Sequence, residues 1–137
     1  MPAVPFKLIT PTKVVFDGDA DLVIAVTTEG EEGILAHHAP FLSALKPGVL
    51  RANIVENGAS KRLELATSEG FMQALPDRVT VLAETVERAE EIDVSRAKKA
   101  LTNAEESLKT AQSEEEFSVA TGKIQRAQAR LEVAQKK

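Results

Sequence analysis

The sequence contains no cysteine, no tryptophan and no tyrosine, and it has only five phenylalanines. The absence of cysteine excludes disulfides, thiolate zinc sites and cysteine nucleophiles, and it fits a reducing cytosol. Nucleic-acid binding normally needs a basic surface or stacking aromatic rings. A net charge of −4 and the shortage of aromatic rings therefore argue against nucleic acid as a partner.

The chain also lacks a long hydrophobic run. Its longest plain apolar run, Leu22 to Val26, has the length of a strand, whereas a helix needs about 20 apolar residues to cross a bilayer. The first residues lack the basic start and apolar stretch of a secretory signal. We therefore expect no direct membrane insertion, and any link to a membrane to go through a partner.

Turn-forming residues are concentrated in the first two-thirds of the chain. All six prolines and six of the seven glycines lie at or before Pro76. Between them, short apolar segments that begin at Phe6, Leu22, Leu50 and Val79 alternate at a period of two, which is typical of strands. The pattern predicts an α+β fold, with an antiparallel β-sandwich over residues 1–87 followed by an antiparallel two-helix hairpin over residues 88–137.

The dipeptide Asn57-Gly58 is the clearest turn signal, because both residues suit the positive φ angles of a two-residue type I′ turn. Such a turn fixes the register of the strands on either side of it, and the apolar pattern agrees with that register. The predicted facing pairs are Glu56 with Ala59, Ala52 with Leu63, Leu50 with Leu65, and Arg51 with Glu64.

The C-terminal region carries a helical pattern. Apolar residues recur there at alternating spacings of three and four along two segments, as in helices that pack side by side. Ser113 followed by Glu116 predicts a capping box at the start of the second helix. The seam residues are Val94, Ala97, Leu101, Ala104, Leu108 and Ala111 in the first helix, and Phe117, Ala120, Ile124, Ala127, Leu131 and Ala134 in the second.

Folding the chain back near residue 114 sets each large seam residue against an alanine. We expect Leu101, Leu108, Ile124 and Leu131 to be buried between two antiparallel helices. Burying one large side chain contributes about 1.5–3 kcal/mol, and ordering one residue of backbone costs about 1–2 kcal/mol. The hairpin is therefore expected to be marginally stable alone and detachable from the sandwich.

Residues with catalytic or metal-binding chemistry are few. His37 and His38 are adjacent, so on a strand they point to opposite faces, and there is no third histidine. Glu29, Glu31 and Glu32 lack the spacing of a calcium loop, and they predict a solvated acidic turn or a polar contact surface. The glycines are too scattered for a phosphate-binding loop. We expect no catalytic residue, no metal site and no required cofactor.

Several segments together resemble the epsilon subunit family of rotary F-type ATP synthases. The resemblance is strongest over residues 30–50, GEEGILAHHAPFLSALKPGVL, in which Gly-Ile-Leu, His-Ala-Pro and Pro-Gly elements follow in order. Residues 69–73 and 77–84 resemble the family's closing strands, and residues 92–97 resemble the start of its helical hairpin. The resemblance covers essentially the whole chain.

This resemblance implies a non-catalytic rotor subunit of a proton- or sodium-translocating synthase. The family's sandwich binds the gamma subunit and lies on the c-subunit ring. Its hairpin extends toward the alpha and beta subunits to restrain ATP hydrolysis, or folds against the sandwich. The implied contacts are Glu29, Glu31 and Glu32 with the ring and His38 with gamma. The implied location is peripheral, at the cytoplasmic face of the plasma or thylakoid membrane.

The resemblance also implies a regulatory ATP site on the folded hairpin. Residues 92–97 match the pattern of nucleotide-binding members, and two arginines of the second helix match theirs. Those arginines lie one turn apart, where guanidinium groups can hold phosphate oxygens. The alternative is that they contact an acidic segment of the beta subunit in the extended state. The candidate residues are Glu87, Ile92, Asp93, Arg96, Ala97, Arg126 and Arg130.

Two other classes of function fit the sequence less well. A free-standing adaptor would use its helices to dimerise as a coiled coil, but an intramolecular hairpin already satisfies both seams. A carbohydrate hydrolase built on a sandwich would need a convergent pair of acids with flanking aromatic residues. Five phenylalanines and no tryptophan make the hydrolase a poor candidate.

Overall fold

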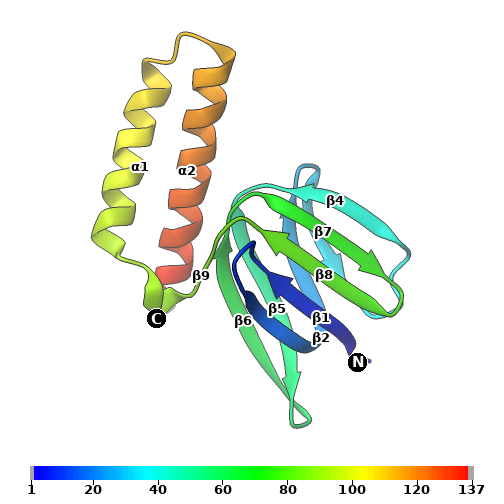
Figure 1. Ribbon diagram of the computed structural model, residues 1–137. Helices are drawn as coiled ribbons and strands as arrows, with labels where there is room; N and C mark the ends of the chain where they lie inside the picture. The colour runs from blue at the N-terminus through cyan, green and yellow to red at the C-terminus, as the bar shows by residue number, and fades with distance from the viewer. Residues whose placement is uncertain (1, 136–137) are drawn as a thin grey trace.

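A computed structural model describes residues 2–135, which form a strand-rich body and two helices, as expected (Figure 1). This arrangement confirms the predicted fold class. The strands are β1 (Val4–Ile9), β2 (Val14–Thr27), β3 (Gly30–Ile34), β4 (Phe41–Leu45), β5 (Gly48–Glu56), β6 (Ala59–Thr67), β7 (Gly70–Leu75), β8 (Arg78–Ala83) and β9 (Val86–Glu87). A 3-10 helix η1 (Ala89–Glu91), helix α1 (Val94–Lys109) and helix α2 (Glu114–Ala134) follow.

Hydrogen bonds link the strands into one continuous sheet that folds over on itself. Its order is β1-β8-β7-β4-β2-β5-β6-β9, with β3 beside β2 and a further pairing of β1 with β2. The paired strands are antiparallel except β1 and β8, which run parallel. The long strand β2 pairs with four other strands and so holds the two layers together.

The β5–β6 hairpin has the predicted register. Asn57 and Gly58 have φ angles of 53° and 78°, as a type I′ turn requires. Glu56 pairs with Ala59, and every other predicted facing pair also occurs. The turn and the apolar pattern therefore determine this register together.

The core lies between the layers of the folded sheet. Alternate residues of each strand point inward, as the period of two predicts. The rings of Phe6 and Phe16 meet with their centroids 5.5 Å apart. The largest fully buried side chains include Phe6, Leu8, Ile34, Leu50, Leu65 and Met72.

Both helices begin at capped ends. The Asp93 side chain accepts a hydrogen bond from the N–H of Arg96 (3.1 Å), and Ser113 accepts one from the N–H of Glu116 (3.1 Å). The Glu116 carboxylate accepts from the N–H of Gln112 (2.7 Å) rather than from that of Ser113. Ser113 is therefore the N-cap as predicted, while the returning bond of the capping box lies one residue earlier.

Burial along the helix seam differs from the expectation. The seam alanines Ala97, Ala104, Ala120 and Ala127 are at most 3% exposed. The large residues Leu101, Leu108, Ile124 and Leu131 are only half-buried, and Phe117 is 55% exposed. The prediction that these four large residues are buried is therefore wrong. Two helices that pack through their alanines leave one side of each large side chain in contact with solvent. The alternation of large and small residues instead lets the two helices approach each other closely through their alanines.

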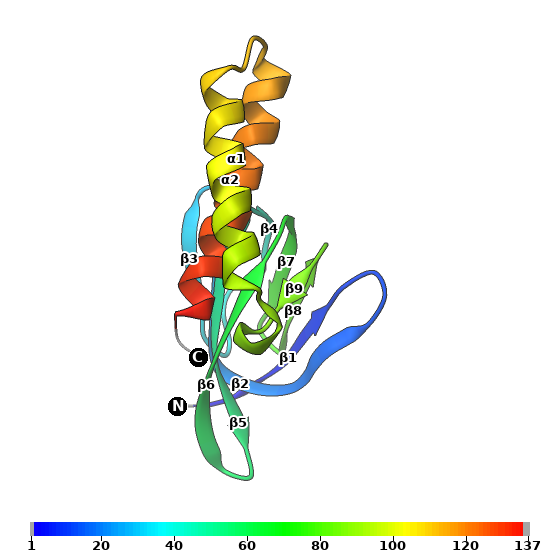
Figure 2. The ribbon, with the colours of Figure 1, turned by 90° about the vertical axis from the view of Figure 1, so that its left-hand side faces the viewer.

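The hairpin is folded back on the sandwich at one end only. The C-terminal half of α2 lies beside β5 and β6, whereas α1 contacts mainly α2. The hairpin tip, residues 110–113, projects away from the strands (Figure 2). Strand β9 ends at Glu87, and the division into units 1–87 and 88–137 stays a prediction.

Candidate functional site

A small apolar contact joins α2 to the sandwich. On α2, Ala129 and Val133 are 6% and 1% exposed, and they belong to a buried cluster with Val49 of β5 and Ala66 of β6. Ile92, Ala97 and Ala134 complete this cluster. It is separate from the sandwich core and consists mostly of alanine and valine, so little apolar area holds the hairpin down.

Ion pairs flank this apolar contact. Arg126 Nη1 donates to both carboxylate oxygens of Glu69 at 2.8 and 3.0 Å, and Arg130 Nε donates to Glu87 at 2.6 Å. Each pair joins α2 to the sandwich. Charged pairs of this length form strong hydrogen bonds, although solvent screening reduces their net contribution at a surface.

The two arginines line an open cleft of about 450 Å³ together with Ser68, Glu69, Glu84 and Thr85. Of the other predicted ATP-binding residues, Glu87 reaches this cleft through its bond to Arg130. Arg96 is exposed on the first turn of α1 and does not line the cleft.

The remaining predicted ATP-binding residues have structural contacts of their own. Asp93 caps α1, while Ile92 and Ala97 are buried in the apolar cluster between the helices and the sandwich. The structure thus brings Arg126, Arg130 and Glu87 together, but it leaves Arg96 apart from them.

The acidic turn between β2 and β3 is held by local hydrogen bonds. The Thr27 hydroxyl donates to the carbonyl of Gly30 (2.7 Å) and accepts from the N–H of Glu29 (3.1 Å). Gly30 has a φ of +116°, a conformation that favours glycine. Glu31 and Glu32 follow on opposite faces of β3, so the three predicted glutamates do not share one surface.

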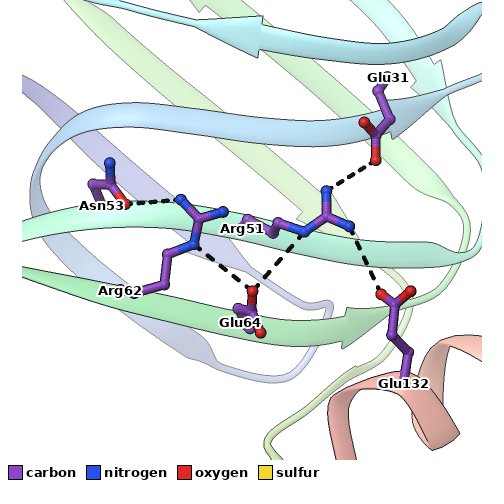
Figure 3. Close-up of polar contacts among 6 residues, drawn as sticks. All are labelled: Glu31, Arg51, Asn53, Arg62, Glu64 and Glu132. Carbon is purple, nitrogen blue, oxygen red and sulfur yellow. Dashed lines mark hydrogen bonds and ion pairs between the residues drawn. The ribbon is translucent and has the colours of Figure 1, made fainter. Parts of the chain in front are cut away.

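Glu31 belongs to a group of ion pairs centred on Arg51 of β5, which we call the Arg51 cluster (Figure 3). Arg51 Nη1 donates to Glu31 at 2.9 Å, and this hydrogen bond is the main reason that the pKa of Arg51 lies above its ordinary value. Arg51 Nε lies 3.9 Å from Glu64 of β6, and Nη2 lies 3.8 Å from Glu132 of α2. The Arg51 cluster therefore connects the acidic turn, the sandwich and the hairpin.

His38, the predicted gamma contact, lies in the loop before β4. Its Nδ1 is 2.7 Å from the carbonyl oxygen of Ala39, its Nε2 is 3.7 Å from Glu32, and its ring meets the Phe41 ring edge-on at 6.1 Å. His37 adopts a φ of 66° and is exposed. Within residues 2–135, no group of three histidine, cysteine or acidic side chains is arranged to hold a metal ion.

An exposed apolar face covers the outer side of β4, β7 and β8. Leu42, Phe71 and Leu82 are 70%, 57% and 39% exposed. Phe71 pairs directly with Leu82 on one side and with Ala44 on the other, so these side chains are neighbours on one surface. We call Leu42, Phe71 and Leu82 the apolar face.

The apolar face and the docking residues of α2 were not among the predicted sites. Consecutive apolar residues in β7 and β8, such as Phe71-Met72 and Val81-Leu82, signal strands that are apolar on both sides. Likewise, Ala129 and Val133 lie four residues apart and off the seam, which signals a second apolar stripe on α2. None of the helices in the described part of the chain is long and apolar enough to span a bilayer.

Two family matches together cover nearly the whole chain. Residues 3–89 match the ATP synthase Delta/Epsilon chain beta-sandwich domain, and residues 90–135 match the Delta/Epsilon chain long alpha-helix domain. The ATP synthase epsilon chain of Herpetosiphon aurantiacus is 43% identical over 96% of this chain and 93% of its own length. The ATP synthase epsilon chain of Syntrophobacter fumaroxidans is 45% identical over 97% of this chain and 96% of its own length.

Solved structures share the fold. A chain in the Euglena gracilis mitochondrial ATP synthase structure, OSCP/F1/c-ring, superposes with a TM-score of 0.80 at 24% identity, covering 98% of this chain and 83% of that one. A chain in the central stalk/c-ring structure of the Tetrahymena thermophila mitochondrial ATP synthase superposes with a TM-score of 0.69 at 16% identity, covering 96% of both. From the family matches and the bacterial relatives, we conclude that the chain belongs to the delta/epsilon chain family of ATP synthases, as an epsilon-type, non-catalytic subunit.

Proposed function

We propose that this subunit joins gamma to the c-ring in the rotor of a proton- or sodium-translocating F-type ATP synthase, and that its hairpin restrains ATP hydrolysis. The apolar face carries the first part of the proposal, because contiguous exposed apolar residues on a soluble domain mark a docking site. The two solved structures that share the fold, an F1/c-ring assembly and a central stalk/c-ring assembly, support it. Through that complex the subunit lies peripherally at the cytoplasmic face of the plasma or thylakoid membrane.

Gamma is the partner that we assign to the apolar face. Phe71 supplies an aromatic anchor with Leu42 and Leu82 beside it, a composition typical of the centre of a protein interface. His38 precedes β4 and rests on Phe41, next in sequence to Leu42. Neighbouring residues of a strand point to opposite faces, so His38 lies at the start of β4 on the side of Phe41 and not on the apolar face itself. We propose its contact with gamma at this end of β4, where a polar residue of the interface rim is expected.

The acidic turn is the part that we assign to the ring. Replacing Glu31 by lysine is expected to weaken binding of the gamma-bound subunit to purified c-ring about tenfold, because a charge at an interface rim is reversed. The Glu31 side chain is 57% exposed, so the free energy of unfolding should change by less than about 1 kcal/mol. Surface-immobilised c-ring and soluble subcomplex give the affinity directly.

Glu105→Lys is the matched control for this experiment, because Glu105 is exposed on α1 and is assigned no ring contact. It should leave ring binding unchanged. Unaltered affinity of the Glu31→Lys variant for the ring would remove the assignment of the acidic turn.

Restraint of hydrolysis requires a hairpin that leaves the sandwich. The contact between α2 and the sandwich suits such a change, since it combines a small alanine-rich cluster with solvent-accessible ion pairs. Two arrangements must differ by only a few kcal/mol for a binding partner to select one of them. The extended hairpin would present Arg126 and Arg130 to acidic residues of the beta subunit.

ATP is the regulatory ligand that we propose for the folded state. Its phosphates would replace the carboxylates of Glu69 and Glu87 on Arg126 and Arg130, in the cleft that the two arginines line. A triphosphate carries more charge than either carboxylate and can engage both guanidinium groups together. Bound nucleotide would then keep the hairpin away from the catalytic subunits.

Calorimetric titration of ATP into the isolated subunit tests this ligand. We expect saturable heat, and at least about tenfold weaker binding by Arg126→Ala, because one charge-assisted hydrogen bond contributes about 1.5–3 kcal/mol. Lys123→Ala is the control, since Lys123 is an exposed cation of α2 outside the cleft. No heat up to millimolar nucleotide, or equal affinities of Arg126→Ala and the parent, would leave the arginines only their role in docking.

A further inference from the structure

The Arg51 cluster draws carboxylates from three elements to one guanidinium. Glu31 comes from β3, Glu64 from β6 and Glu132 from α2 (Figure 3). A second arginine, Arg62, lies 3.7 Å from Glu64 and donates to Asn53 at 3.0 Å. Through Arg51, the pair with Glu132 links the acidic turn to the hairpin.

The contacts of Arg51 with its three carboxylates are unequal in length. Its bond to Glu31 has the length of a charge-assisted hydrogen bond, whereas Glu132 at 3.8 Å lies beyond hydrogen-bonding distance. Glu31 therefore holds the guanidinium through Nη1, while Glu132 approaches the same guanidinium at Nη2.

We propose that Glu31 and Glu132 compete for Arg51, so that a partner which engages Glu31 strengthens the docking of α2 on the sandwich. This inference rests on the proposed function only in naming the c-ring as that partner. When Glu31 is neutralised or drawn away, Arg51 is free to close its contact with Glu132 to a hydrogen bond of roughly 2.9 Å. Ring contact and the folded hairpin then favour each other, as linkage requires.

The opposite sign would follow if Glu31 only positioned Arg51. In that arrangement Glu31 orients the guanidinium toward Glu132, and loss of Glu31 would loosen the hairpin. Competition predicts that loss of the Glu31 charge tightens the docking of α2, and positioning predicts that it loosens it. The direction of this change therefore decides between them.

Hydrogen exchange of the α2 amides in the isolated subunit shows whether docking of α2 becomes tighter or looser. At low ionic strength, Glu31→Gln should slow exchange around Ala129 and Val133, which pack on the sandwich, by about two- to fivefold, the range expected of an exposed ion pair. The effect should vanish near 1 M salt, where charges are screened beyond about 3 Å. Exchange in β7 and β8 should not change.

Two further variants isolate the competition. Glu31→Gln should have no effect on α2 exchange in a Glu132→Gln background, because the competing carboxylate is absent. Glu29→Gln, in the same acidic turn but outside the Arg51 cluster, should have no effect in the parent. Unchanged or faster α2 exchange in Glu31→Gln would overturn the proposal.

This experiment is separable from the test of ring binding. The isolated subunit contains no ring, so unchanged exchange would refute competition for Arg51 and leave the ring contact of Glu31 standing. Normal ring binding by Glu31→Lys would have the reverse consequence.

Discussion

Replacing Gly70 by alanine is expected to destabilise the sandwich by about 3 kcal/mol, at the upper end of the usual cost of overpacking. A Cβ at this position would lie 1.9 Å from the carbonyl oxygen of Leu82 and 2.8 Å from the Cα of Ala83. Both are backbone atoms of β8, the strand that pairs with β7 at Gly70. The two strands must separate to avoid this overlap, which would break the backbone hydrogen bonds between β7 and β8 beneath the apolar face.

Gly33→Ala in β3 is the matched control for Gly70→Ala. The nearest atom to its added Cβ would be Leu22 Cδ1 at 3.8 Å, an ordinary van der Waals contact. The loss of backbone freedom in the unfolded chain should stabilise this variant by about 0.4–1 kcal/mol. Urea denaturation of both variants measures the difference, and a similar change in the two free energies of unfolding would contradict the close approach of β7 and β8.

Local chemistry made the β5–β6 hairpin predictable. Asn57-Gly58 accepts the positive φ angles of the turn, and the alternating apolar residues select the same register. Arg51 and Glu64 were therefore placed opposite each other from sequence. Glu132 could not be added to that pair, because its position depends on where α2 docks, and contacts between distant segments leave no local pattern.

The helix seam was predictable in kind but not in detail. Alternation of large and small residues predicted two helices in close contact, and the buried alanines confirm that. The pattern alone could not show that Leu101 and Ile124 stay partly exposed, because their full burial would need a third element beside the two helices. In the described part of the chain, the C-terminal half of α2 has such an element, where Ala129 and Val133 meet β5 and β6.

The proposed sites depended on family resemblance more than on local chemistry. Glu31, His38 and Arg126 were singled out by motif, and their ring, gamma and ATP contacts stay predictions. The structure adds their intramolecular partners, Arg51, Glu32 and Glu69. Each of these acidic or basic residues thus already has a partner within the subunit, which an incoming ligand or protein must displace.

Phe71→Glu is expected to lower the affinity of this subunit for gamma about thirtyfold or more. This is the effect of losing a central interface residue that contributes at least about 2 kcal/mol. Phe71 lies at the middle of the apolar face and is 57% exposed, so a carboxylate there is compatible with the free fold but not with a desolvated contact. Phe117→Glu is the matched control, because it makes the same substitution at a residue of α2 that is similarly exposed, at 55%.

Co-purification with gamma is the measurement that tests the rotor assignment most directly. The subunit and a gamma subunit produced together should elute from size-exclusion chromatography as a one-to-one complex. The Phe117→Glu variant should still form that complex, and the Phe71→Glu variant should elute alone. A subunit that elutes without gamma as a dimer of its own, or equal gamma binding by both variants, would contradict the assignment.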